Sequence, residues 1–276
     1  MTDAAADADR STSKAAEPIC YDVAEGVATI TIDNPDRRNV LDATSIAGMR
    51  EALRLAAADD AVRVVVLTGT GNTFCAGADL AGATGGDATS FAGSGPRALA
   101  ALLEDLLDHP KPTIARVQGH VAGGGNGLVA ACDLAIAVEG ARFAFSEVRV
   151  GVAPAVISVV CLARLHPSDA YELLLTGERV SAERVRSAGM LTRVVPEDSL
   201  DAAVATLVGQ LALGGPGALA ATKKLLRQVP TMGRSDAFAF TSDLSAELFA
   251  SDEARAGMTA FLSRTRPPWA PAEQGS

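Results

Sequence analysis

The sequence contains few of the residues that mark a disulfide-bonded, metal-binding or nucleic-acid-binding protein. Its 276 residues include only four cysteines, and none has CxxC spacing. This disfavours a disulfide scaffold or a structural zinc site and favours small buried thiols in a reducing compartment. With 24 basic and 33 acidic residues, the net charge is −9, so no basic face is available for the phosphates of a nucleic acid.

Long apolar runs are also absent. The most apolar one, Val150–Leu162, is 13 residues long and contains Pro154, whereas a membrane-spanning helix needs about 20 residues. Residues 1–18 are small, polar and charged, without the apolar stretch of a signal peptide. We therefore expect a disordered N-terminus at 1–18, a cytoplasmic location and no membrane partner.

Strand-like and helical segments alternate over the first half of the chain. Predicted strands cover 26–33, 63–68, 112–118 and 133–138, and predicted helices cover the stretch opened by Asp42, 97–108 and 124–132. The run at 63–68 is continuously apolar, as a parallel strand buried on both faces requires. This order predicts an α/β fold with a mostly parallel sheet.

After about residue 155 the pattern becomes helical, without strong strands. Helical periodicity covers 168–176, 181–188, 198–213, 217–228, 235–249 and 251–263. Ser181, Pro216 and Ser251 are typical helix starts. We expect residues 19–200 to form the core and 201–276 a helical C-terminal region, with Phe238, Phe240, Phe249 and Phe261 in the core or in a subunit interface.

Two glycine-rich segments, Gly69–Leu80 and Gly119–Leu128, each follow a strong predicted strand. Small residues at such a junction let a ligand approach the backbone, and the free N–H groups of a helix start point toward it. Two junctions side by side could supply two N–H donors to one developing oxyanion.

Other interpretations of these glycines remain possible. Residues 125–130 match the dinucleotide pattern GxGxxA, but that pattern belongs to the first βαβ unit of its fold and this match lies deep in the chain. The sequence has no GKS or GKT of a phosphate-binding loop and no GxSxG of a serine hydrolase. The glycines could also serve only the close packing of helix on strand.

Seven pieces in order make the chain similar to the enoyl-CoA hydratase/isomerase (crotonase) superfamily. They are NPDRRNVL (34–41), FCAGADL (74–80), GHVAGGGNGL (119–128), CDLAIA (132–137), FSEVRVGVAPAV (145–156), LLLTGERVSAERVRSAGMLTRVVP (173–196) and SDEARAGMTAFLSRTRP (251–267). Within it, the chain most resembles single-glutamate bacterial hydratases of the methylglutaconyl or branched type. The resemblance implies the crotonase (ClpP-like) spiral of ββα units with a helical C-terminal trimerisation region.

The resemblance also implies a set of site residues. The backbone N–H groups of Ala78 and Gly124 would hold the thioester oxygen, and Glu147 would be the catalytic carboxylate. Without the resemblance, Glu147 beside Ser146 and Arg149 would be interpreted as part of a surface ion pair. The implied substrate contacts are Arg37, Arg38, Ala78, Asp79, Leu80, Ala81 and Gly124, with the 81–96 loop and Phe91 as a wall of the acyl pocket.

One departure affects the reaction. Many hydratases of the family carry a second glutamate where this chain has Gly127. We expect hydration of a 2-enoyl-CoA with Glu147 as sole acid/base group. The alternatives are a 3-enoyl to 2-enoyl-CoA isomerase using the same glutamate and a catalytically silent acyl-CoA-binding protein.

The remaining polar candidates have weaker roles. Lys223, Lys224 and Arg227 are alternative cations for the CoA phosphates, although solvated faces are the simpler interpretation. We expect His120 to be packed or capping, His109 and His166 to be solvated, Cys75 to be core and Asp79 to anchor its turn. The resemblance further implies a homotrimer or a dimer of trimers, no metal, and no cofactor beyond the coenzyme A of the substrate.

Overall fold

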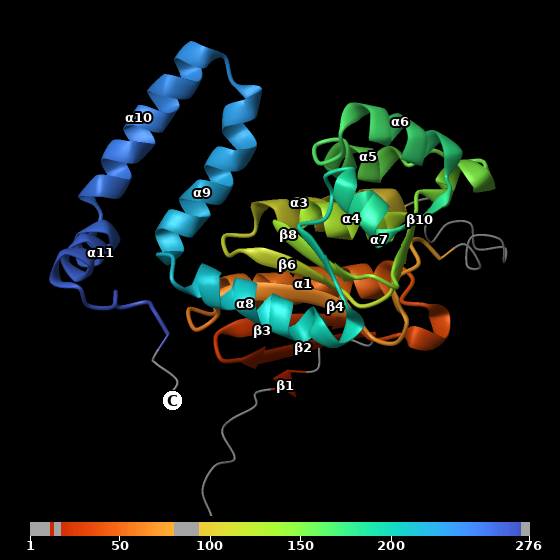
Figure 1. Ribbon diagram of the computed structural model, residues 1–276, viewed down its shortest axis with the longest axis horizontal. Coiled ribbons are helices and arrows are strands. Elements are labelled where there is room, and N and C mark those ends of the chain that lie inside the picture. Colours follow the sequence, from red (N-terminus) through yellow and green to blue (C-terminus); the bar gives the residue numbers. More distant parts are fainter. Residues whose placement is uncertain (1–11, 14–17, 80–93, 272–276) are drawn as a thin grey trace, which may run out of the picture.

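A large, mostly parallel sheet forms the centre of the protein (Figure 1). The computed structural model describes residues 12–13, 18–79 and 94–271. Among these, one sheet has the order β1-β2-β3-β4-β6-β8-β11. Its strands are β1 (Thr12–Ser13), β2 (Ile19–Ala24), β3 (Val27–Ile32), β4 (Val64–Gly69), β6 (Thr113–Val117), β8 (Leu134–Val138) and β11 (Arg193–Val195). From β3 to β11 all neighbours are parallel, as predicted from the buried apolar run of β4.

A second, smaller sheet has the order β10-β9-β7-β5. Its strands are β5 (Thr73–Cys75), β7 (His120–Ala122), β9 (Arg142–Ala144) and β10 (Arg179–Ser181). The first three strands, β5, β7 and β9, pair in parallel, so their carboxyl ends meet at one edge. Each strand is three residues long, too short for a period-two pattern to emerge from the sequence. After residue 155, where no strong strand was expected, the structure adds two short strands, β10 and β11.

The predicted helices are present, several with the predicted starts, and the structure adds one helix that was not predicted, over residues 155–161. They are α1 (Ala43–Ala58), α3 (Gly95–Asp108), α4 (Gly124–Ala131), α5 (Ala155–Cys161), α6 (Pro167–Thr176), α7 (Ala182–Ser187), α8 (Leu200–Ala212), α9 (Pro216–Gln228), α10 (Arg234–Ala250) and α11 (Asp252–Ser263), with short 3₁₀ turns η1 (Pro35–Arg37), η3 (Ser146–Val150), η4 (Glu197–Ser199) and η5 (Val229–Thr231). Asp42 forms a reciprocal capping box with Ser45. Ser181 and Ser251 cap α7 and α11 with their side chains, and Pro216 opens α9.

The C-terminal helices divide into two groups. The helix α8 packs on β4, β6 and β8, whereas α9, α10 and α11 extend away from the sheets (Figure 1). Phe238, Phe249 and Phe261 on these outer helices are 69%, 70% and 83% exposed. The expectation that they are core residues is wrong for this single chain, and the interface remains a prediction.

No helix of the described chain is long and apolar enough to cross a membrane by itself. Length and composition alone would admit one pair, Glu197–Ala212 with Pro216–Thr231, but that pair is bent by 105°.

A buried polar cluster attaches α9 to the core. Lys223 is nearly buried, with its Nζ 2.6 Å from a carboxylate oxygen of Asp133 and donating to the carbonyl of Lys111 at 2.9 Å. The same Asp133 oxygen accepts from the backbone N–H of Thr113 at 2.7 Å. The interpretation of Lys223 as a solvated or phosphate-binding cation is therefore wrong, because Asp133 already neutralises it inside the protein.

His109 is part of the same region and is also buried, which contradicts the expectation of a solvated side chain. Its Nε2 lies 3.2 Å from the carbonyl of Leu53, near the end of α1, and its Nδ1 lies 3.2 Å from the backbone nitrogen of Lys111. Burial is the main cause that lowers the pKa of His109, and the cations of Lys223 and Lys111 add to it. The neutral imidazole thus joins α1 to the segment before β6.

We expect Asp133→Ala to destabilise the protein by about 3–5 kcal/mol, because it leaves the ammonium of Lys223 buried without a counter-charge. Lys223→Met leaves Asp133 without its counter-charge, but that carboxylate is 28% exposed and still accepts hydrogen bonds from Thr113, so the cost should be smaller, about 1–2 kcal/mol. Urea unfolding at several protein concentrations measures both. Asp252→Ala, which breaks the exposed pair with Arg255, is the control and should change little. Equal losses for Asp133→Ala and Lys223→Met would contradict this account.

Candidate active site

Two glycine turns meet at the carboxyl edge of the smaller sheet. Gly77 follows β5 and Gly123 follows β7, and both have positive φ, at +84° and +49°. A Cβ on Gly77 would lie 2.9 Å from the carbonyl oxygen of Ala122 and 3.0 Å from the nitrogen of Gly124. The turns approach so closely that a side chain at Gly77 cannot be accommodated.

Among the described residues, these turns provide no acceptor for the N–H groups of Ala78 and Gly124. Leu41 forms a parallel bridge with Ala78, in which Leu41 donates to the carbonyl of Gly77 at 2.7 Å and Asp79 donates to that of Leu41 at 3.3 Å. This pattern directs the N–H of Ala78 away from Leu41. Gly124 is the first residue of α4, so its N–H has no partner within the helix. Among the described residues, neither N–H has a backbone acceptor outside regular elements.

Glu147 reaches the same place from η3, just after β9. Its Oε1 lies 3.6 Å from the position that a Cβ on Gly123 would take. Its Oε2 is buried and has no hydrogen-bond partner within the described chain. Burial raises the pKa of Glu147, and a hydrogen bond from its own backbone N–H partly offsets this. The neighbouring phenylalanines Phe143 and Phe145 are fully buried, whereas Val148 and Val150 are exposed.

The interpretation of Glu147 as part of a surface ion pair is wrong. Arg149 donates through Nε to the carbonyl of Thr176 at 3.1 Å instead. The carboxylate therefore lies beside the two glycine turns without a cation from this segment. A half-buried, unpaired carboxylate with a raised pKa is suited to moving protons.

The space beside Gly127 is filled by apolar side chains. A Cβ at this position would lie 2.6 Å from Cγ2 of Ile157 and 3.3 Å from Cδ1 of Leu103. A glutamate side chain at 127 therefore has no room in this packing. The preceding Asn126 is fully buried and bonded to backbone carbonyls. Beside the turns, Asp79 is paired with Arg37, whereas Glu147 has no ion pair among the described residues.

The two arginines predicted to contact coenzyme A differ in their surroundings. Arg37 forms ion pairs with Asp79 and with Asp42, the latter at 3.3 Å, so Asp79 anchors its turn as expected. Arg38 is exposed, has a φ of +55°, and has no ion pair among the described residues. Leu80, Ala81 and Phe91 lie outside the described residues.

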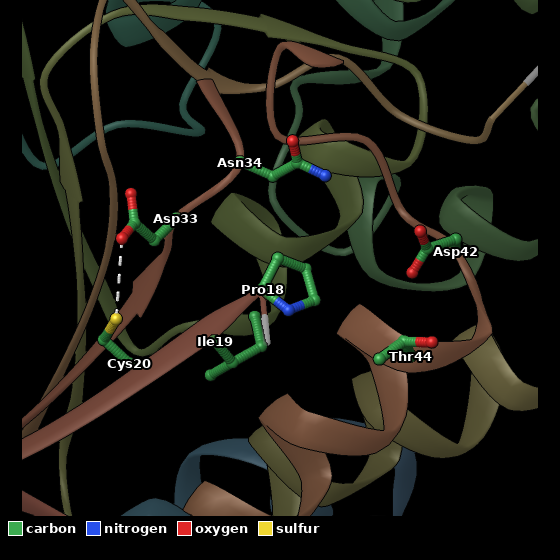
Figure 2. Close-up of a pocket in the computed structure, with 7 residues that line it drawn as sticks. All are labelled: Pro18, Ile19, Cys20, Asp33, Asn34, Asp42 and Thr44. Atoms are coloured by element: carbon green, nitrogen blue, oxygen red, sulfur yellow. Dashed lines mark hydrogen bonds between the residues drawn. The ribbon is translucent and has the colours of Figure 1, made fainter. Parts of the chain in front are cut away.

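A polar pocket of about 490 Å³ lies beside the segment that carries Arg37 and Arg38 (Figure 2). It is lined by Pro18, Ile19, Cys20, Asp33, Asn34, Asp42 and Thr44. Figure 2 shows the thiol of Cys20 directed toward Asp33, at an S–O distance of 3.6 Å. Cys20 is exposed, contrary to the expectation of four buried thiols. The two carboxylates of the pocket make it a poor place for the phosphates of a nucleotide.

The other candidates have structural surroundings. Cys75 is buried, which raises the pKa of its thiol to about 12, as expected of a core residue rather than a nucleophile. The Nδ1 of His120 accepts from the backbone of Arg142 at 3.2 Å. Lys224 lies over the ring of Phe240, at 5.4 Å from its centre. His166 is exposed, and Arg227 is paired with Asp108. In the described residues no three His, Cys, Asp or Glu side chains are grouped to hold a metal ion.

Comparison with known proteins identifies similar sequences and folds. Carnitinyl-CoA dehydratase of Salmonella typhi is 33% identical over 88% of this chain and 94% of its own length. Enoyl-CoA hydratase EchA19 of Mycobacterium tuberculosis is 32% identical over 86% of this chain and 91% of its own. The crystal structure of an enoyl-CoA hydratase from Mycobacterium smegmatis superimposes with a TM-score of 0.86 at 32% identity, covering 91% of this chain and 98% of that one.

The family comparison covers nearly the whole chain. The sequence model of the enoyl-CoA hydratase/isomerase family matches residues 22–272, which include both sheets except β1 and the start of β2, both glycine turns and the C-terminal helices. The structure from Mycobacterium smegmatis shares the fold over 91% of this chain. This chain of crotonase fold belongs to the enoyl-CoA hydratase/isomerase family.

Proposed function

We propose that the protein adds water to a 2-enoyl-CoA to give a 3-hydroxyacyl-CoA, with Glu147 as its acid/base group. The observation that carries this proposal is the position of Glu147, whose Oε1 is 3.6 Å from the Cβ position of Gly123, beside the N–H of Gly124. The names of the relatives, enoyl-CoA hydratase and carnitinyl-CoA dehydratase, support addition or removal of water next to a thioester.

In the proposed mechanism, the thioester oxygen accepts hydrogen bonds from the N–H groups of Ala78 and Gly124. The carboxylate of Glu147 takes a proton from water while the water oxygen bonds to C3. The electron pair of the double bond moves toward the carbonyl, so the negative charge of the enolate develops on the oxygen held by the two donors. Glu147 then delivers its proton to C2. Loss of one preorganised donor typically costs about 3–4 kcal/mol of barrier.

The substrate contacts follow from the same placement. Arg37 shares its charge between two carboxylates, whereas Arg38 is exposed and without an ion pair in the described chain, so we assign the larger part of phosphate binding to Arg38. Asp79, Leu80 and Ala81 are further proposed substrate contacts, of which only Asp79 lies within the described residues. Coenzyme A enters as part of the substrate, and the proposed chemistry uses no further cofactor or metal.

A second candidate, transfer of a double bond from a 3-enoyl to a 2-enoyl-CoA, is favoured by one observation. Ile157 and Leu103 fill the space at Gly127, so a second carboxylate that could hold water is absent from that position. An isomerase needs one group that moves a proton between two carbons, and Glu147 would suffice. The alternative of a silent acyl-CoA-binding protein is disfavoured by the retained, partly buried Glu147.

Glu147→Gln should lower kcat by about 10²–10⁴-fold with little change in KM, because the amide cannot exchange the proton. The assay follows loss of the conjugated enoyl thioester from crotonyl-CoA and 3-methylglutaconyl-CoA. Glu197→Gln, an exposed carboxylate on η4, is the matched control and should retain wild-type rates. Wild-type turnover by Glu147→Gln would exclude this mechanism.

Isotope incorporation separates the candidate reactions. With ¹⁸O-labelled water, hydration places the label at C3 of the product, whereas isomerisation of a 3-enoyl-CoA shifts the double bond and incorporates none. Binding of acyl-CoA without turnover of either substrate class would leave the silent binder.

The acid side of the kcat/KM profile should have a midpoint above the ordinary glutamate pKa of about 4.3. Burial raises the pKa of Glu147, and the carboxylate form must accept the proton of water, so activity falls as the pH drops through this raised value. Circular dichroism at each pH separates titration from acid unfolding. A midpoint at or below the ordinary value, with the fold intact, would contradict the assignment.

The proposal includes a cytoplasmic homotrimer or dimer of trimers built through the C-terminal helices. Exposed Phe249 on α10 and Phe261 on α11 would be covered by a neighbouring subunit. Sedimentation should show a trimer or hexamer, and Phe261→Asp should shift it toward monomer. A wild-type protein that sediments only as a monomer would refute the assembly.

A further inference from the structure

We propose that Asn126 is a positioning residue. Its side-chain amide links two segments, namely the turn that carries the N–H of Gly124 and the end of the strand β9, which leads to Glu147. The inference rests on the proposed function, since it concerns the same thioester site. Asn126 itself does not touch the reacting atoms and acts through the backbone it bonds.

The hydrogen bonds of Asn126 connect two separate segments. Its Nδ2 donates to the carbonyl of Ala144 at 2.9 Å, at the end of β9, and to the carbonyl of Gly123 at 3.2 Å. The residue is fully buried. Its Oδ1 is buried without a partner in the described part of the chain. Burial of the unpaired Oδ1 costs free energy, because this acceptor loses its contact with water. The two hydrogen bonds that Nδ2 donates must offset this cost, so we attribute the presence of Asn126 to them.

The two bonded carbonyls flank the catalytic groups. Gly123 immediately precedes the N–H of Gly124, and Ala144 lies three residues before Glu147. The backbone already makes one link, because Gly123 donates to the carbonyl of Ala144 at 3.1 Å. The side-chain amide of Asn126 adds a second hydrogen-bonded connection between the same two segments. One hydrogen bond would let the segments rotate relative to each other, whereas two fix their relative orientation.

This arrangement also predicts that the fold survives loss of the side chain. The carbonyl of Gly123 still accepts from the backbone N–H of Asn126 at 2.9 Å, and that of Ala144 still accepts from Gly123. Neither carbonyl becomes unsatisfied, so the expected effect is looser geometry rather than unfolding. Because the donor and the carboxylate act on different atoms of one substrate, a displacement of about 1 Å can cost about 100-fold in rate.

The experiment compares Asn126→Ala and Asn126→Asp with wild type and with Thr113→Ala. Thr113 is likewise buried and bonds through its hydroxyl to Asp133, at the amino end of β6, away from the glycine turns. The aspartate keeps the shape of the asparagine but places oxygen against the two carbonyls. Unfolding, kcat and KM are measured for each protein.

A second readout does not require turnover. Butyryl-CoA, labelled with ¹³C at the thioester carbonyl, is saturated and cannot be hydrated. Its carbonyl stretching frequency falls when N–H donors polarise the bound thioester. Infrared difference spectra of the complexes therefore report on the donors themselves.

We expect Asn126→Ala to lower kcat by about 10–100-fold, with KM changed less than about threefold, and to lose about half or more of the carbonyl shift. Asn126→Asp should lose at least as much. Thr113→Ala should be less stable than wild type but keep its kcat and carbonyl shift. Wild-type kcat and shift in folded Asn126→Ala, or equal losses in Thr113→Ala, would overturn the inference.

Failure of the proposed reaction would be distinguishable. If wild type polarises butyryl-CoA but turns over no enoyl-CoA, hydration is wrong, and the carbonyl shift of the variants still decides the role of Asn126. If wild type produces no carbonyl shift, the oxyanion site itself is refuted, and the positioning role fails with it.

Discussion

The close approach of two backbone turns is the constraint on which the rest of this structure depends. Gly77 and Gly124 lie near enough that a Cβ on the former would be 3.0 Å from the nitrogen of the latter. Parallel pairing of β5 with β7 creates this approach, because it places the carboxyl ends of both strands at one edge. The adjoining strand β9 leads to Glu147 at the same edge. The larger sheet and its helices hold the three short strands that could not form a stable sheet alone.

The site combines a rigid polar backbone with apolar packing around a single carboxylate. The N–H groups of Ala78 and Gly124 belong to turns whose conformations are fixed by tertiary contacts rather than by side-chain rotamers. Glu147 is partly desolvated without a counter-charge from Arg149, and the hydrogen bond from its own backbone N–H stabilises its charge only in part. Such a group is destabilising for the fold and useful for proton transfer, which is a common compromise at catalytic sites.

Local patterns in the sequence predict the strong elements well. The apolar run of β4 and the cap at Asp42 are recognisable because their signals come from adjacent residues. The three-residue strands of the smaller sheet escape periodicity analysis, since their pairing is decided by neighbours far along the chain. The burial of Lys223 depends on a carbonyl 112 residues away, and that of His109 on one 56 residues away. Glu147 itself was suggested by family resemblance, whereas the contacts of Asn126 became visible only in three dimensions.

The packing around Gly127 also bears on how such a site can evolve. Glutamate at this position would overlap Ile157, so a lineage cannot gain a second carboxylate here by one substitution without overfilling the core. A smaller residue at 157 must arise first, at the cost of a cavity, before the new side chain becomes tolerable. The two positions are thus epistatic. Their order of change is constrained, because sterics alone oppose a glutamate at 127 while Ile157 is present.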